Sequence, residues 1–228
     1  MIRLCILDFD GTLCGTHDAI AFCIDATFDH YGVPRPGVER REAVIETGVV
    51  MAEAMAILNA NTPYERDNEQ WAATYRALYR EHGLAHSHLF PGVRKALERL
   101  KASGRTLVIA SNKAPASVDM ALAHYGLAPF IDLAVCDPQG VPKKPDPASY
   151  TRLIAPVFSG IAPTDTVMVG DTAADRGFAR NIGAYFAWAS YGYGDPHASL
   201  AHGSDAVLKS FAELPDVIET LSAMPPRN

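Results

Sequence analysis

The chain has 228 residues, 48% of them hydrophobic, and its 20 Lys and Arg against 26 Asp and Glu give a net charge of −6. A chain of this length and apolar content can bury a large core, which excludes intrinsic disorder and a miniprotein held by disulfides. The mild acidity argues against a nucleic-acid partner, and no apolar run reaches the roughly 18 residues of a membrane span. With no signal-peptide pattern after Met1, we expect a cytoplasmic protein with no nucleic-acid and no membrane partner.

The first part of the chain contains a strand and then a long helical region. The apolar run Ile2–Leu7 is typical of a buried strand. From residue 17 to residue 88 the apolar residues instead recur at helical spacing. We therefore expect an all-helical insertion over residues 15–88, between two parts of one core that comprises residues 1–14 and 89–228.

After residue 92 the pattern changes to alternating helices and strands. The expected strands are 106–110, 131–135, 166–169 and 184–188. The expected helices begin near Val93, near Val118, after Pro147, at Thr172 and near Leu214. Strands separated by helices specify a parallel sheet covered on both faces. The fold class that we expect is therefore α/β, a Rossmann-like sandwich with an inserted helical domain.

Polar residues follow the expected strands of the core. They are Asp8 and Asp10 after the first strand, Ser111 and Asn112 after the second, Lys144 after the third, and Asp171 with Asp175 after the fourth. In open parallel sheets, ligands bind beyond the carboxyl ends of the strands. Folded together, these strand ends would form one cluster.

The expected cluster holds four carboxylates against the ammonium of Lys144, a formal charge of −3. Two like charges about 4 Å apart repel by ~4 kcal/mol at an effective dielectric constant of ~20, so such a cluster needs a cation. Carboxylate oxygens without His or Cys partners favour Mg²⁺, which commonly keeps waters and a substrate phosphate in its octahedron. We therefore predict Mg²⁺ as the cofactor and a small phosphorylated metabolite as the partner.

Four ordered segments resemble the motifs of the haloacid dehalogenase superfamily. They are Asp8-Phe9-Asp10-Gly11-Thr12-Leu13, Ser111, Lys144-Pro145 and Gly170-Asp171-Thr172-Ala173-Ala174-Asp175. Their order and their strand-end placement match as well, over essentially the whole chain. The resemblance implies that residues 15–88 are the helical cap of this family. Ser111-Asn112-Lys113 and the loop 191–194 further resemble phosphoglycolate-phosphatase-like members.

The resemblance implies a role for each matched residue. Asp8 would be the nucleophile that forms an aspartyl-phosphate, and Asp10 would protonate the leaving oxygen and then activate water. Ser111 would hydrogen-bond a phosphoryl oxygen, and Lys144 would offset the negative charge. The implied metal ligands are Asp8, the backbone carbonyl of Asp10, Asp171 and Asp175, the last of which would either hold the metal's water shell or position Lys144. Further phosphoryl donors would be the backbone N–H groups near Phe9, Asp10 and Asn112.

The residue at position 10 decides the reaction type. Dehalogenases and phosphonatases of this family lack an aspartate there, so Asp10 indicates a phosphatase or a phosphomutase. A phosphomutase of the β-phosphoglucomutase kind would keep the same core and differ in its cap. A non-catalytic binding module would not require both carboxylates of the first motif. We predict the phosphatase, acting on a small monoester such as a phosphoglycolate-like one, as a monomer or homodimer.

Two further assignments depend on the resemblance. Lys143 stands beside Lys144, and the Lys-Pro pattern with Pro145 favours Lys144. Between two expected cap helices, where such caps carry a specificity loop, Thr47 and Gly48 are predicted to contact the substrate.

Overall fold

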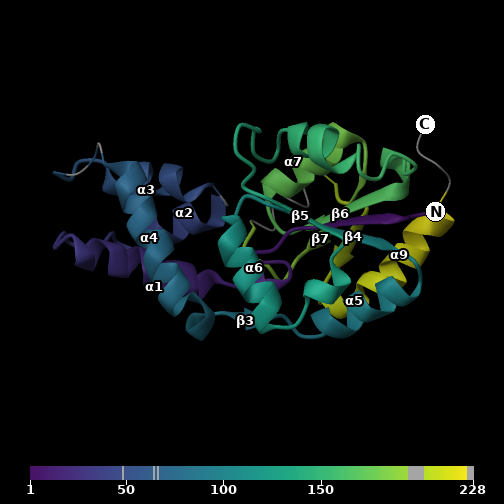
Figure 1. Ribbon diagram of the computed structural model, residues 1–228, viewed down its shortest axis with the longest axis horizontal. Helices are drawn as coiled ribbons and strands as arrows, with labels where there is room; N and C mark the ends of the chain where they lie inside the picture. Colours follow the sequence, from purple (N-terminus) through teal and green to yellow (C-terminus); the bar gives the residue numbers. More distant parts are fainter. Residues whose placement is uncertain (48, 64, 66, 195–202, 225–228) are drawn as a thin grey trace. The chain divides into compact units, whose positions relative to one another are not determined.

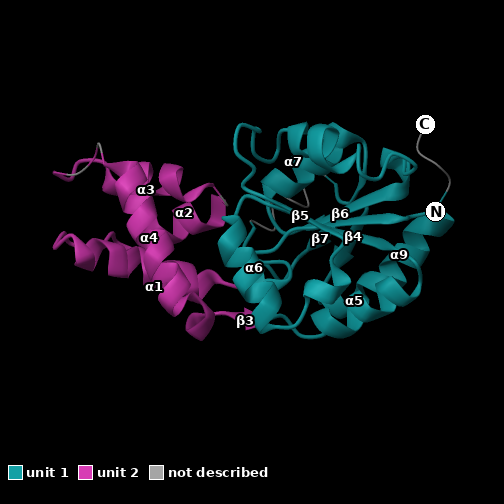
Figure 2. Cartoon of the chain, viewed as in Figure 1, with its two compact units in different colours: residues 1–14, 89–228 teal, residues 15–88 magenta. Residues whose placement is uncertain are grey.

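The computed structural model describes residues 1–47, 49–63, 65, 67–194 and 203–224. The chain divides into two compact units (Figure 2). Unit 1 comprises Met1–Cys14 and Leu89–Asn228, and unit 2 comprises Gly15–His88. Within the described ranges, no helix is both long enough and apolar enough to cross a membrane.

Unit 1 is built on a parallel sheet, in which the described residues form six strands in the order β5-β4-β1-β6-β7-β8. The strands are β1 (Leu4–Leu7), β4 (Thr106–Ser111), β5 (Leu133–Cys136), β6 (Thr166–Gly170), β7 (Tyr185–Ala189) and β8 (Ala206–Leu208). Central β1 pairs with β4 on one side and β6 on the other, so Leu7 lies opposite both Ile109 and Val169. This register brings the residues that follow these three strands to one edge of the sheet, where ligands bind in such folds.

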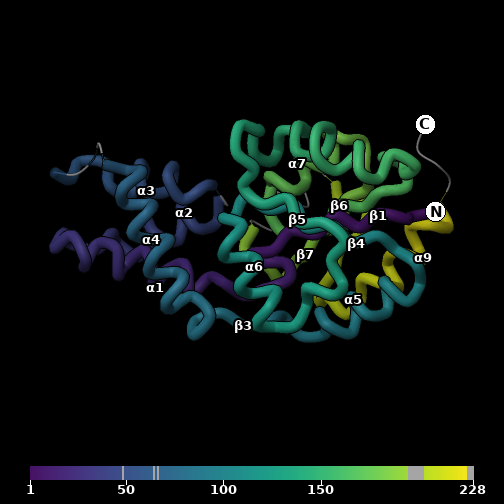
Figure 3. The backbone as a smooth tube through the Cα atoms, viewed as in Figure 1, coloured from purple at the N-terminus to yellow at the C-terminus, as the bar shows by residue number. Residues whose placement is uncertain are grey.

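Helices cover both faces of this sheet. They are α5 (Val93–Ala102), α6 (Pro115–His124), α7 (Ala173–Ile182) and α9 (Leu214–Ala223). Figure 1 shows α7 on one face, with α5 and α9 on the other, and the trace in Figure 3 follows the same layers. On the α7 face, Phe178 packs with Ile6 and Met168 in a cluster of fully buried side chains. The Rossmann-like α/β class expected from the alternating pattern is therefore confirmed.

The helix expected after Pro147 is present, in the form of a π-helix. Residues Tyr150–Ile154 form a short π-helical turn, in which the N–H of Ala155 donates to the carbonyl of Tyr150 at 2.8 Å. The next residue is Pro156, which has no N–H to continue an α-helix and whose ring crowds the carbonyl four residues earlier. The wider turn removes that conflict and still buries Ile154 in the core.

Unit 2 contains helices and no long strand among its described residues. The chain enters it through β2 (Cys14–Gly15) and leaves it through β3 (His88–Leu89). Its helices are α1 (His17–His30), α2 (Val38–Thr47), α3 (Met51–Asn59) and α4 (Asn68–His82), followed by a 3₁₀ turn at Gly83–His86. Fully buried Trp71 packs α4 against α1, because Phe28 meets its ring edge-on at 4.8 Å and Tyr31 stacks on it at 4.3 Å.

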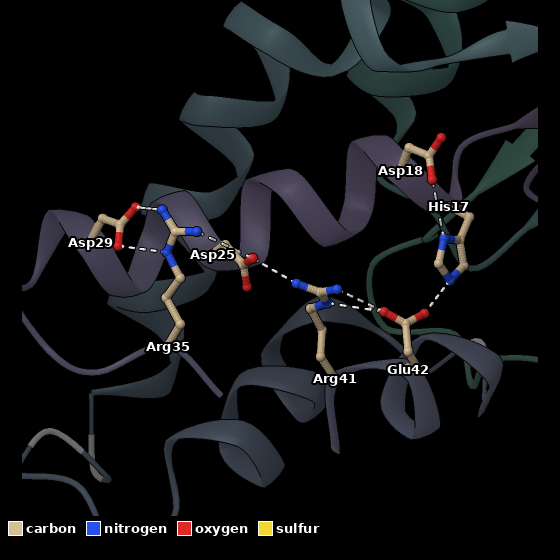
Figure 4. Close-up of polar contacts among 7 residues, drawn as sticks. All are labelled: His17, Asp18, Asp25, Asp29, Arg35, Arg41 and Glu42. Atoms are coloured by element: carbon tan, nitrogen blue, oxygen red, sulfur yellow. Dashed lines mark hydrogen bonds and ion pairs between the residues drawn. The ribbon is translucent and has the colours of Figure 1, made fainter. Parts of the chain in front are cut away.

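A chain of charged side chains joins α1 to α2 (Figure 4). Arg41 of α2 donates to Asp25 of α1 at 2.6 Å and pairs with neighbouring Glu42 at 2.9 Å. Glu42 in turn pairs with His17, the first residue of α1. Since Arg41 and Asp25 are largely buried, with 16% and 18% of their side chains exposed, these pairs fix α2, which ends at Thr47, against α1.

Candidate active site

The loop after β1 carries the first two carboxylates. The N–H of Asp8 donates to the carbonyl of Val169 at 2.9 Å, which continues the sheet by one residue and buries the Asp8 side chain. At Gly11 the backbone turns with a φ of +77°, a conformation that favours glycine. The turn leaves Asp10 partly exposed, with 24% of its side chain accessible. The two carboxylates therefore lie in different surroundings, although only one residue separates them.

Lys144 bridges two buried carboxylates. Its ammonium donates to Asp8 Oδ1 at 2.7 Å and to Asp175 Oδ1 at 2.6 Å. Burial acts to lower the pKa of Lys144, but the charges of Asp175 and Asp8 outweigh it and raise the pKa above its usual value. Neighbouring Lys143 pairs instead with Asp137. Of the two adjacent lysines, Lys144 is thus the one that reaches the expected nucleophile.

Asp175 is held by its own helix. At the N-terminus of α7, its Oδ2 accepts from the backbone N–H of Thr172 at 3.0 Å and from the Thr172 hydroxyl at 2.7 Å, in a capping box. Its Oδ1 accepts directly from the Lys144 ammonium. This direct contact supports the second of its two expected roles, in which Asp175 positions Lys144.

Asp171 lies beneath the loop that follows β7. Its Oδ1 accepts from the Thr12 hydroxyl at 3.1 Å, and its Oδ2 accepts from the backbone N–H of Tyr193 at 2.8 Å. A Cβ at Gly192 would overlap the Asp171 side chain and the carbonyl oxygen of Gly11. The loop 191–194, which the sequence singled out by resemblance alone, therefore forms part of the wall around Asp171.

Gly192→Ala is expected to displace Asp171. Substitutions of residues that support a metal ligand typically change metal affinity by about 10–100-fold, so the Kd for a divalent ion should rise at least about tenfold in isothermal titration. Gly160→Ala is the matched control, because a Cβ at Gly160 would meet no atom within 4 Å. Unchanged affinity in Gly192→Ala would show that the contact with Asp171 is not needed.

Three carboxylates lie close enough together to hold a metal ion. Among the described residues, Asp8, Asp171 and Asp175 each offer one oxygen within 4.8 Å of the others. Burial raises the pKa of Asp8 to about 7, with Lys144 opposing the rise and Asp175 adding to it. Burial also raises the pKa of Asp171 well above its usual range, and the charges of Asp175 and Asp8 add to this rise. The one ammonium of Lys144 cannot balance three carboxylates when all of them are charged. A ligand set made only of carboxylate oxygens fits Mg²⁺.

The end of β4 contributes the expected phosphoryl-binding residues. Ser111 is buried, and its hydroxyl accepts from the N–H of Lys113 at 3.4 Å. The Asn112 side chain bonds the backbone of Lys144, accepting from its N–H at 3.2 Å and donating to its carbonyl at 3.5 Å. Asn112 thus fixes the loop that carries the lysine, a contact that its expected role did not include.

The remaining predicted residues are Phe9, Thr47 and Gly48. The Phe9 ring is buried, and the Phe9 carbonyl accepts from the N–H groups of Leu13 and Cys14 at 3.0 Å each. Its side chain therefore belongs to the core, so only its N–H could contact substrate. In unit 2, Thr47 is the last residue of α2, and its hydroxyl donates to the carbonyl of Val44 at 2.6 Å. Gly48 lies outside the described residues.

The sequence interpretation named Lys113 only as part of Ser111-Asn112-Lys113 and gave it no role. Its ammonium donates to both oxygens of Asp10, at 2.9 and 3.1 Å, and its side chain is 8% exposed. The expected cluster consequently holds four carboxylates against two ammonium groups, a formal charge of −2 rather than −3. The sequence feature that could have indicated a role is its position two residues after Ser111, at the end of the strand that pairs with the strand before the first motif.

Comparison with known proteins identifies the family. A model described as haloacid dehalogenase-like hydrolase matches residues 5–189. The chain belongs to the haloacid dehalogenase-like hydrolases. The phosphoglycolate phosphatase of Chromobacterium violaceum is 31% identical to it over 221 residues, 96% of this chain and 97% of the relative. That of Nitrosococcus oceani is 29% identical over 218 residues, 95% of this chain and 96% of the relative.

Solved structures of this family have the same fold. A predicted phosphoglycolate phosphatase from Haemophilus somnus superposes with a TM-score of 0.83 at 25% identity, over 95% of this chain and 97% of that one. A haloacid dehalogenase-like hydrolase from Bacteroides fragilis gives a TM-score of 0.82 at 22% identity, over 94% and 100%. The prediction of a phosphoric monoester hydrolase of this family, made from the four motifs, is confirmed by these relatives.

Proposed function

We propose that this haloacid dehalogenase-like hydrolase cleaves a small phosphate monoester in two steps through an aspartyl-phosphate at Asp8, with Mg²⁺ as cofactor. The observation that carries the proposal is the position of Asp8. It is a buried carboxylate at the carboxyl end of the central strand, bonded by Lys144 at 2.7 Å and grouped with Asp171. A group of buried carboxylates needs positive charge from a bound metal ion. The same positive charge attracts the phosphate of a substrate to the nucleophile.

The first step transfers the phosphoryl group to the protein. A carboxylate oxygen of Asp8 attacks phosphorus and forms a new O–P bond, while the bond from phosphorus to the ester oxygen breaks. Asp10 gives a proton to that leaving oxygen, so the product leaves as an alcohol. In the second step a water attacks the phosphorus of the aspartyl-phosphate, Asp10 takes its proton, and the Asp8–phosphorus bond breaks to release inorganic phosphate.

The remaining residues hold the phosphoryl oxygens. The Ser111 hydroxyl and the Lys144 ammonium are proposed to donate to them, together with the backbone N–H groups of Phe9, Asp10 and Asn112. We propose that Mg²⁺ is held by the carboxylates of Asp8 and Asp171 and by the backbone carbonyl of Asp10. Asp175 positions Lys144. When bound, the ion neutralises the charge that the carboxylates and the phosphoryl group bring together.

The raised pKa of Asp8 gives the stability of the metal-free protein a definite dependence on pH. In the unfolded chain this carboxyl titrates at about 3.9, and in the folded protein at about 7. Between these values the folded protein binds more protons, so stability at this site falls as pH rises. Bound Mg²⁺ offsets the carboxylate charge. We expect millimolar Mg²⁺ to raise the thermal midpoint by several degrees more at about pH 8 than at about pH 5.

Scanning fluorimetry of EDTA-treated protein, with and without Mg²⁺, measures this difference at each pH. Titration of groups away from the metal site contributes to the absolute midpoints and cancels in the Mg²⁺-dependent shift, whereas Asp171, whose pKa burial also raises, adds to the pH dependence of that shift. Asp8→Asn removes one of the two carboxyls and should reduce the pH dependence. An equal Mg²⁺ shift at both pH values in the wild-type protein would contradict the assignment.

The substrate that we propose is a small phosphorylated acid of the phosphoglycolate kind. The support is the names of the two relatives, which align over nearly their whole length, and the loop 191–194 that packs on Asp171. Thr47 is proposed to take part in choosing the substrate; this remains a prediction from the sequence, since the structure supports only its position at the end of α2.

A chromogenic phosphomonoester and a panel of phosphorylated metabolites, each with Mg²⁺ and with EDTA, test the proposal. We expect release of inorganic phosphate with Mg²⁺, none with EDTA, and the highest kcat/KM for a short phosphorylated carboxylic acid. An isomerised sugar phosphate without released phosphate would instead identify a phosphomutase. Binding without turnover would identify a non-catalytic module.

A further inference from the structure

Lys113 binds the carboxylate that has to act on the leaving oxygen. Its ammonium donates to both oxygens of Asp10, at 2.9 and 3.1 Å. This pair joins the end of β4 to the loop after β1, across 103 positions of the chain. Only 8% of the lysine side chain is exposed, so the pair is shielded from most of the solvent that would weaken it.

Lys113 and the reacting oxygen compete for the same two oxygens of Asp10. Giving a proton to a leaving oxygen, or taking one from water, requires a carboxylate oxygen within hydrogen-bond reach of the reacting oxygen. In the structure Lys113 contacts both oxygens of Asp10. Each Asp10 oxygen that accepts from Lys113 keeps one further lone pair, so release of the ammonium would give the reacting oxygen open access to both Asp10 oxygens. An ammonium that leaves Asp10 needs another anion.

A phosphate monoester brings such an anion to the right place. The backbone N–H of Lys113 donates to the hydroxyl of Ser111 at 3.4 Å, which ties the lysine to the residue proposed to bind a phosphoryl oxygen. Its four-carbon side chain can turn without moving that backbone. Lys144 differs, because it lies between the buried carboxylates of Asp8 and Asp175 and would remove the ammonium from both if it moved.

We propose that the Lys113 ammonium exchanges partners, binding Asp10 in the absence of substrate and the phosphoryl oxygens of the monoester in its presence. The exchange frees Asp10 only when there is a phosphate to transfer. It also adds a second ammonium to the phosphate-binding groups, which suits a doubly charged phosphate. This inference rests on the proposed function, in which Asp10 serves the leaving oxygen.

A double-mutant cycle measured with inorganic phosphate in the presence of Mg²⁺ tests the exchange. Isothermal titration gives the Kd for the wild-type protein, Asp10→Asn, Lys113→Met and the double variant. Asp10→Asn releases Lys113 and should tighten phosphate binding by about tenfold, the size of one charge-assisted hydrogen bond. In the Lys113→Met background the same substitution should have less than about a twofold effect. An equal effect in both backgrounds would overturn the exchange.

Lys113→Met removes the cation that pairs with Asp10, and this variant could fold poorly for that reason. The experiment is still decisive in that case. The comparison of Asp10→Asn with the double variant then suffices, since neither leaves a charged Asp10. Loss of Lys113 should weaken phosphate binding by at least about tenfold there, and an unchanged Kd would overturn the proposal. Lys101→Met is the matched control, because Lys101 donates to both oxygens of Asp132 at 2.7 and 2.8 Å in the same unit; its phosphate Kd should equal the wild-type value.

Failure of this inference is distinguishable from failure of the proposed function. A wild-type protein that hydrolyses monoesters and binds phosphate, but shows no coupling between Asp10 and Lys113, contradicts the exchange alone. A wild-type protein that neither hydrolyses monoesters nor binds phosphate contradicts the proposed function, and the exchange with it.

Discussion

Asp8→Asn is expected to lower kcat for phosphate monoester hydrolysis by at least about 10⁴-fold, the scale seen when an enzyme loses its nucleophile. The amide has the shape of the carboxylate and lacks the charged oxygen that attacks phosphorus. Asp8 is also the carboxylate that Lys144 bonds at 2.7 Å, so both the nucleophile and the charge pattern change. The rate of inorganic phosphate release, measured with saturating Mg²⁺ and substrate, gives kcat for both proteins.

A matched substitution outside the site separates this effect from a general one. Asp216 lies in α9, 70% exposed and paired with Arg99, and Asp216→Asn should keep wild-type kcat. Acid quenching during turnover, followed by peptide mass spectrometry, should find phosphate on the peptide that contains Asp8. Turnover that survives in Asp8→Asn would exclude this residue as the nucleophile.

Lys144→Met is expected to damage both folding and chemistry. It leaves Asp8 and Asp175 as buried charges without their shared ammonium. Breaking a buried pair by removing one partner typically costs 3–5 kcal/mol in the free energy of unfolding, so urea denaturation of the metal-free protein should show a loss of about that size. Added Mg²⁺ should recover part of this loss, because the ion supplies positive charge to the same carboxylates.

Activity should not recover with stability in this variant. In Mg²⁺ and under conditions where the protein stays folded, kcat should remain at least about 10²-fold below wild type, because no ammonium offsets the phosphoryl charge. Lys143→Met is the control from the same loop. Lys143 is 29% exposed and pairs with Asp137, so its loss should change stability by less than about 1 kcal/mol and leave kcat unaltered. Equal effects of the two substitutions would refute the distinct position of Lys144.

Strand-end polar residues were predictable because a parallel sheet brings them together whatever the details of its packing. The apolar run before Asp8, the run before Ser111 and the run before Asp171 each read as a buried strand, and the structure has β1, β4 and β6 there. The short last strand β8 (Ala206–Leu208) was not predicted, since three residues carry too little periodicity to recognise. The π-helical turn also has a local cause, because Pro156 follows it and has no N–H that could continue an α-helix.

The order of residues along the chain thus determined the α/β class, the helical segment between the first motif and the rest, and the acidic character of one sheet edge. Only the tertiary structure decided which polar groups contact one another. Lys113 pairs with Asp10, Lys144 lies between Asp8 and Asp175, and the N–H of Tyr193 donates to Asp171. Periodicity reports only which face of a strand or helix is buried. Lys113–Asp10 and Lys144–Asp8 join side chains more than 100 positions apart, so they depend on strand order and on side-chain reach, which no local pattern encodes.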